Sequence, residues 1–250
     1  MMPKKNIVLI MVGLIILCGC SQSSFMANVI RFDQAFIPAY YYTGLGKKLP
    51  AQSALKLLRK EWENFSISYY NFMPRDREWK EDLSEIDEKI SIAIGLVNKG
   101  KGLELARKNL EKIRNLAWRM RQRNGIKYYL DQLNDFDEVL EAMLLIVNRK
   151  IPPPLNDTDL QNLRWLVDRG LVLWQKAAKS EFNHQLFGFN QKKIKLMKSY
   201  FQAESVLLVK ARKIIIEGDK RAIIQNANGL KPNFTKLYLL FGDFNRLKPD

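Results

Sequence analysis

Cysteine and histidine are almost absent from this chain. Its 250 residues include two cysteines, Cys18 and Cys20, and one histidine, His184. Covalent attachment of a c-type heme needs Cys-x-x-Cys-His, which does not occur, so that class of protein is excluded. A nucleophilic triad would have to use His184, and neither Gly-x-Ser-x-Gly nor a glycine-rich phosphate-binding loop is present. These absences argue against hydrolases of the triad type and against nucleotide binding.

Long hydrophobic runs are also scarce. The clearest apolar run, residues 6–17, follows Lys4 and Lys5 near the N-terminus. A helix needs roughly 20 apolar residues to cross a bilayer, so this run is too short for a permanent span. A short basic segment, an apolar segment and small residues in this order are typical of a signal peptide.

The end of that run, Leu17-Cys18-Gly19-Cys20, resembles the lipobox of bacterial lipoproteins. The resemblance implies that residues 1–19 are a signal peptide and that Cys20, acylated with chains such as palmitate, becomes the first residue of an exported protein. Loss of Cys18 and acylation of Cys20 would then leave no free thiol. Ser21, where an aspartate would retain such a protein at the inner membrane, implies the outer membrane, facing the periplasm. In a host with a single membrane, the same signal implies a cell-surface protein.

The charge is strongly one-sided, with 41 Lys and Arg against 26 Asp and Glu and a formal net charge of +15. In a cytoplasmic protein this excess would favour nucleic acid as a partner. Export instead directs the interpretation to the polyanions of the cell envelope, which are anionic lipid and polysaccharide. We therefore expect a membrane contact through the lipid anchor and a contact with such a polyanion or with another envelope protein, but no nucleic acid.

Helical periodicity dominates the chain from residue 52 onward. Apolar residues recur every three or four positions in four successive stretches, which begin at Leu55, Leu83, Leu103 and Tyr129. No stretch has the alternation of a strand, and 47% of the residues are hydrophobic. The sequence predicts an all-α protein, an antiparallel helical bundle, with an α-solenoid of helix pairs as the alternative.

The triple proline at residues 152–154 is the clearest break in the sequence, because consecutive prolines cannot be helical. We predict an anchor and linker at 20–51 with a short docking helix at 33–42, and then two related helical halves, 52–150 and 151–250. The stretch Asn156 to Asp159 offers helix-capping residues after the break. Gly229 and Pro232 predict that the end of the second half contains two short helices, at 219–228 and 233–241.

Three polar residues, Glu181, His184 and Glu204, occupy positions where the helical spacing of apolar residues predicts another apolar residue. Glu181 and His184 have the i, i+3 spacing that di-iron helical bundles use for metal ligands, but those bundles need two such motifs. A b-type heme could use His184 with Met197, although no motif selects that pair. A metal, heme or small-ligand carrier is therefore an alternative, and we expect no cofactor.

Arg107, Arg114 and Arg121 recur every seven residues, a spacing that would project three guanidinium groups in one direction. They are the candidates for binding a polyanion or partner. An acidic row, Asp131, Asp135, Glu138 and Glu141, could pair with them from the neighbouring helix.

The sequence favours a membrane-anchored envelope lipoprotein that binds or scaffolds and is not catalytic. A cell-wall-cleaving enzyme stays a further alternative, because a glycosidase needs only two carboxylates in a cleft.

Overall fold

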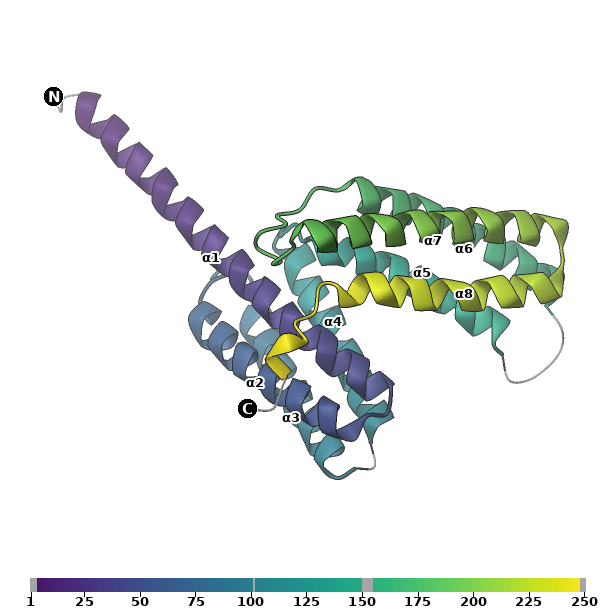
Figure 1. Cartoon of the computed structure of the whole chain (residues 1–250). Coiled ribbons are helices and arrows are strands. Elements are labelled where there is room, and N and C mark those ends of the chain that lie inside the picture. Colours follow the sequence, from purple (N-terminus) through teal and green to yellow (C-terminus); the bar gives the residue numbers. More distant parts are fainter. Residues whose placement is uncertain (1–3, 101, 150–154, 248–250) are drawn as a thin grey trace. The chain divides into compact units, whose positions relative to one another are not determined.

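The computed structural model describes residues 4–100, 102–149 and 155–247, with side chains from Ser23 onward (Figure 1). Within these ranges the secondary structure is entirely helical, which confirms the predicted all-α helical bundle. The helices are α1 (Lys4–Gly44), α2 (Lys48–Tyr69), α3 (Trp79–Asn98), α4 (Leu103–Arg123), α5 (Tyr129–Val147), α6 (Asp157–Lys179), α7 (Gln191–Glu217), α8 (Lys220–Leu239) and the short 3₁₀ helix η1 (Asn245–Leu247).

The chain divides into two compact units, and the division differs from the predicted one. Unit 1 comprises Met1–Met120 together with Gly242–Asp250, and unit 2 comprises Arg121–Phe241. The predicted boundary at residue 151 therefore lies inside unit 2, between two helices that pack against each other, α5 and α6. The boundary at residue 120 lies inside α4, where the helical pattern continues without a break.

Unit 1 is built around a long pairing of α1 with α2, and α3 packs on α2. Its core is aromatic: the Phe25 ring stacks on Phe72 with centroids 4.4 Å apart and meets Tyr69 edge-on at 5.0 Å. Trp62 and Trp79 are both buried. Such ring pairs favour offset and edge-on geometry and stabilise a core beyond the area they bury.

The first helix is longer than the predicted docking helix at 33–42, because α1 continues through Pro38. Proline has no N–H to donate to the carbonyl four residues earlier, here that of Gln34. The Asp243 N–H donates to that carbonyl instead, at 2.9 Å. The fold thus satisfies the carbonyl that Pro38 leaves free with a donor from the far end of the chain.

Residues 242–247, which we call the C-terminal strap, close unit 1. A Cβ placed on Gly242 would lie 2.9 Å from a methyl carbon of Ile37, so the strap approaches α1 closely here. Phe244 meets Tyr41 edge-on at 6.0 Å, and Arg246 pairs with the buried Glu61 of α2.

Unit 2 is a four-helix bundle in which each helix packs on the next and α8 returns to α5 (Figure 1). Trp174 is at its centre, with ring centroids 4.5 Å from Phe136 and 4.6 Å from Phe201. The Trp174 indole N–H donates to the Phe201 carbonyl at 3.0 Å. The chain reverses direction between successive helices, most sharply at Gly218 and Asp219 between α7 and α8, which gives an antiparallel arrangement.

The ends of the helices in unit 2 follow local sequence rules. Asn156, the first residue of the predicted capping stretch 156–159, caps α6 through a reciprocal capping box with Asp159. The backbone N–H of Asn156 donates to the Asp159 carboxylate. This bond, together with the nearby Arg149, holds the pKa of Asp159 below its usual value. Gly218 ends α7 in the left-handed conformation that favours glycine.

The prediction of two short helices at 219–228 and 233–241 is wrong, because α8 runs unbroken through Gly229 and Pro232. Pro232 leaves the carbonyl of Asn228 without its helical donor, but Asn228 is exposed and water can bond that carbonyl. Burial of Leu230 and Phe234 on one face holds the helix together across this point.

As far as the structure describes their residues, none of the helices combines the length and the apolar character needed to cross a bilayer.

Candidate functional site

The three predicted arginines do not form one exposed row. Arg121 belongs to unit 2, is 6% exposed, and bonds Asp131 through Nε at 3.0 Å from Oδ2. Its guanidinium carbon also lies 4.7 Å from the centroid of the Tyr128 ring. The last turn of α4 belongs to unit 2, and there Arg121 is buried against Asp131 and Tyr128 instead of being exposed with the other two arginines.

Arg107 and Arg114 both lie over the ring of Tyr40 in unit 1, at 4.8 and 5.5 Å from its centroid. Arg107 donates to the Tyr40 hydroxyl at 3.1 Å, and that hydroxyl donates to Glu111 at 3.1 Å. Both arginines are half-buried. They fasten α4 to α1, which leaves less of their charge for a partner than the sequence suggested.

In the acidic row on α5, Asp131 pairs with Arg121, one of the three arginines expected to face the row, whereas Glu141 pairs with Lys231 of α8, which was not expected. Besides the Arg121–Asp131 pair, Lys231 of α8 bonds the buried Asp137 at 2.6 Å and also contacts Glu141. Burial lowers the pKa of Lys231, but Asp137 and Glu141 outweigh it, so the net shift is upward. Burial and the nearby Asp131 raise the pKa of Asp135.

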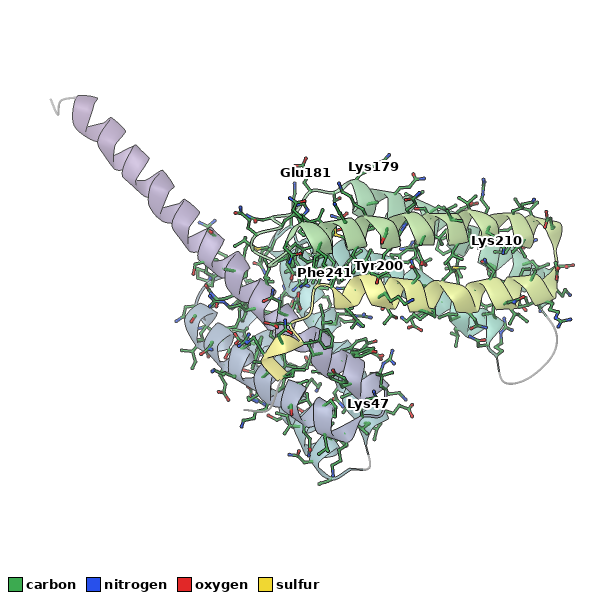
Figure 2. All side chains as sticks on the ribbon, in the orientation of Figure 1. Lys47, Lys179, Glu181, Tyr200, Lys210 and Phe241 are labelled. Carbon is green, nitrogen blue, oxygen red and sulfur yellow. The ribbon has the colours of Figure 1, made fainter. Side chains whose placement is uncertain are left out.

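The metal-ligand spacing of Glu181 and His184 fails because the two residues are not on a helix. α6 ends at Lys179, and Ser180 adopts an extended backbone that leads into the loop. Glu181 points outward at this end of the bundle, beside Lys179 (Figure 2). His184 packs edge-on against Phe182 with centroids 4.4 Å apart.

Glu204 is the predicted site residue with the most unusual surroundings. It is fully buried on α7, and Asn233 of α8 donates to its Oε2 at 2.7 Å. Its Oε1 has no hydrogen-bond partner among the described residues. Burial raises the pKa of Glu204 to about 8, against the smaller opposing effect of the Asn233 bond. The carboxyl group is therefore mostly protonated at neutral pH.

Glu204 does not combine with Glu181 or His184 into a metal site. Across the described residues, no three His, Cys, Asp or Glu side chains are grouped so that they could hold a metal ion. Met197, the candidate partner of His184 for a heme, is buried on α7.

A surface that the sequence reasoning missed lies across the outer sides of α6 and α7. Asp168 of α6 and Arg212 of α7 form an exposed ion pair between the helices at 2.7 Å. Four exposed apolar side chains lie within one helical turn of it: Trp165, Val172, Val209 and Ile216. We call these six residues the α6–α7 face. In the sequence, the only sign of this face is that apolar residues occur on the otherwise polar side of each helix.

A second surface feature is a groove of about 410 Å³ between α2 and α3, lined by Ser66, Ile67, Tyr70, Leu83, Ser84 and Asp87. Ile67 is the most exposed of the large apolar residues described, at 80%. The helix beside it is acidic: α3 carries five acidic residues and two lysines. The groove therefore differs in charge from the α6–α7 face.

The segment after Cys20 is short. Cys20 lies within the span of α1, and Phe25 is the first buried residue among those whose side chains are described. Only residues 21–24 separate the two, so the predicted linker at 20–51 is mostly part of the folded unit.

The chain matches no protein-family model, no curated protein and no solved structure at a significant level, so its function has to be argued from these residues and surfaces alone.

Proposed function

We propose that this protein is an exported lipoprotein, anchored through acylated Cys20, that binds or scaffolds another component of the cell envelope and is not catalytic. The sequence Leu17-Cys18-Gly19-Cys20 after a basic and apolar segment is the basis of the proposal. Ser21, in place of an aspartate after the anchor, favours the outer membrane, facing the periplasm, as its location.

The described core of unit 1 starts close to the proposed anchor. Phe25, five residues after Cys20, is buried in that core. Residues 21–24 span at most roughly 14 Å when extended. The anchor would hold unit 1 directly at the membrane surface, where effective concentration favours contacts with other membrane-held components.

Mass spectrometry of the mature protein from its host tests the anchor. We expect an N-terminal peptide that begins at Cys20 and carries two or three acyl chains, and a Cys20→Ala variant that stays as the unprocessed precursor. Separation of the two membranes on a density gradient should place the protein in the outer membrane, and Ser21→Asp should move it to the inner one. A mature chain that still contains residues 1–19 and lacks acyl groups would refute the proposal.

Crosslinking in the native host, followed by identification of the captured species, tests the binding role. Substitution of the predicted arginines by glutamate tests whether they bind the partner. Arg121 is unsuitable for this test, because it is buried and its substitution would disturb the fold. Arg107→Glu with Arg114→Glu is the appropriate pair, since both are partly exposed. Unchanged capture by this double variant would remove these arginines from the binding surface.

A further inference from the structure

The α6–α7 face exposes more apolar surface than a solvated helix pair requires. Trp165, Val172, Val209 and Ile216 are 59 to 67% exposed, and Val206, one turn from Val209, is 63% exposed. Apolar residues scattered singly on a surface need no explanation, but these gather around one ion pair on two neighbouring helices.

The exposed charge of α6 and α7, taken over the whole of both helices, has one dominant sign. Of the exposed charged residues of α6 and α7, ten are basic and three are acidic. The basic ones are Arg164, Arg169, Lys176, Lys179, Lys192, Lys195, Lys198, Lys210, Arg212 and Lys213, and the acidic ones are Asp157, Asp168 and Glu217. Two further acidic residues, Asp159 and Glu204, are buried and do not contribute to the surface.

We propose that the α6–α7 face is a second membrane-contact site, which docks unit 2 on the surface of an anionic bilayer. This proposal rests on the proposed lipid anchor, since the anchor supplies the nearby bilayer. Apolar side chains inserted at the headgroup level, with Lys and Arg around them, are the pattern of helices that lie on membranes. Trp165 is the residue type enriched at that level, and long basic side chains extend from apolar surroundings to the headgroups.

The geometry suits a fluid bilayer better than a folded partner. The apolar side chains stand out from two adjacent helices and are separated by the Asp168–Arg212 pair. A protein partner would have to match each of these positions in shape, whereas lipids adjust to them. Each basic residue near an anionic surface adds attraction that falls with salt, so the contact should depend on both lipid charge and ionic strength.

The experiment uses the mature, anchored protein in vesicles, with Val172→Cys labelled by an environment-sensitive fluorophore. Leu145→Cys is the matched control, because Leu145 is an apolar residue of the same bundle, 74% exposed, on α5. Vesicles contain either phosphatidylcholine alone or phosphatidylcholine with 30% phosphatidylglycerol. We expect a blue shift and at least threefold protection from iodide quenching at position 172, only with phosphatidylglycerol, and loss of both in 1 M NaCl.

A charge variant sharpens the test. Arg164→Glu, Lys210→Glu and Lys213→Glu together should abolish the protection at position 172, while Lys56→Glu, Lys60→Glu and Lys112→Glu, three exposed positions of unit 1, should leave it unchanged. Circular dichroism confirms that each variant is folded.

The outcomes separate this proposal from the proposed function. If Cys20 carries acyl chains but position 172 stays open to iodide with phosphatidylglycerol, the membrane-contact site is refuted and the anchor stands. If Cys20 carries none, the proposed function fails, and absence of the shift on vesicles at low salt would refute the site as well. Protection without vesicles that grows with protein concentration would assign the face to a second copy of this chain and overturn the lipid proposal.

Discussion

The cores of the two units differ in the side chains that they bury. The core of unit 1 is a cluster of aromatic rings around Phe25 and Trp62. Unit 1 also buries Glu61 and Asp82, whereas unit 2 buries five charged side chains, among them Arg121, Asp131 and Glu204. Apolar packing is insensitive to pH, whereas buried charges and buried carboxyl groups couple stability to partners and protons. The stability of unit 2 should therefore respond more strongly to pH than that of unit 1.

The units also differ in how the chain builds them. Unit 2 is one continuous segment, Arg121–Phe241, in which each helix packs against the next helix along the chain. Unit 1 needs the strap from beyond unit 2 to complete it, through the Asp243 N–H and Arg246. Because the chain forms two separate units, a substitution in the core of one unit should mainly destabilise that unit.

The largest expected effect comes from the two core tryptophans. Trp62→Ala and Trp174→Ala should each lower the free energy of unfolding by about 4 kcal/mol, because each removes a fully buried side chain and leaves a cavity. Hydrogen exchange should show the loss in α1–α3 for Trp62→Ala and in α5–α8 for Trp174→Ala. Equal loss in both units for either variant would show that they unfold as one body.

Breaking the buried ion pair of unit 2 should cost somewhat less. Arg121→Met leaves Asp131 buried without this partner and should destabilise the protein by about 3 kcal/mol in denaturant titrations. Arg121→Met combined with Asp131→Leu should recover most of that loss, since two apolar residues leave no charge behind. A double variant as unstable as the single one would show that the pair itself, rather than the orphaned charge, matters.

The pH response should identify Glu204. Its pKa is higher in the folded chain, about 8, than the ordinary 4.5, so folding favours the protonated form. The stability from this group is complete below pH 4.5 and is lost as the pH rises toward 8. Between pH 6 and pH 8 the wild type should lose about 2 kcal/mol in thermal melts, and Glu204→Gln should remove that slope. A Glu204→Gln variant with the wild-type slope would contradict this assignment.

The smallest effect tests the strap. Arg246→Ala removes the partner of the buried Glu61 and should cost about 1 kcal/mol, seen as faster exchange in α1 and α2. Asp168→Asn, which breaks an exposed pair, is the control and should cost less than about 0.5 kcal/mol. Similar effects of the two variants would mean that the strap contributes no more than a surface contact.

Much of the fold could be predicted because core stripes obey helical period. The residues that recur from Leu83 to Val97 are all buried, and so is Glu204, where the polar residue interrupts its stripe. The division into units could not be predicted, because it lies inside α4, whereas the prolines at 152–154 connect two helices of one bundle. A run of prolines can separate two helices without separating two packing units.

The candidate site was predicted less well. Periodicity extended past Lys179 to Glu181 and His184, but a period cannot show where a helix stops. The spacing of Arg107, Arg114 and Arg121 showed a shared side of α4 but not what packs on it. The α6–α7 face depends on which helices are neighbours, and tertiary packing determines that.

The strap has a consequence for the order of events during synthesis. Residues 242–247 leave the ribosome after the whole of unit 2, yet their donors complete the core around α1, which leaves first. Domains generally fold as units while the chain emerges, so unit 2 can form before unit 1 is finished. Unit 1 is therefore completed last, although its first helix precedes every other helix in the chain.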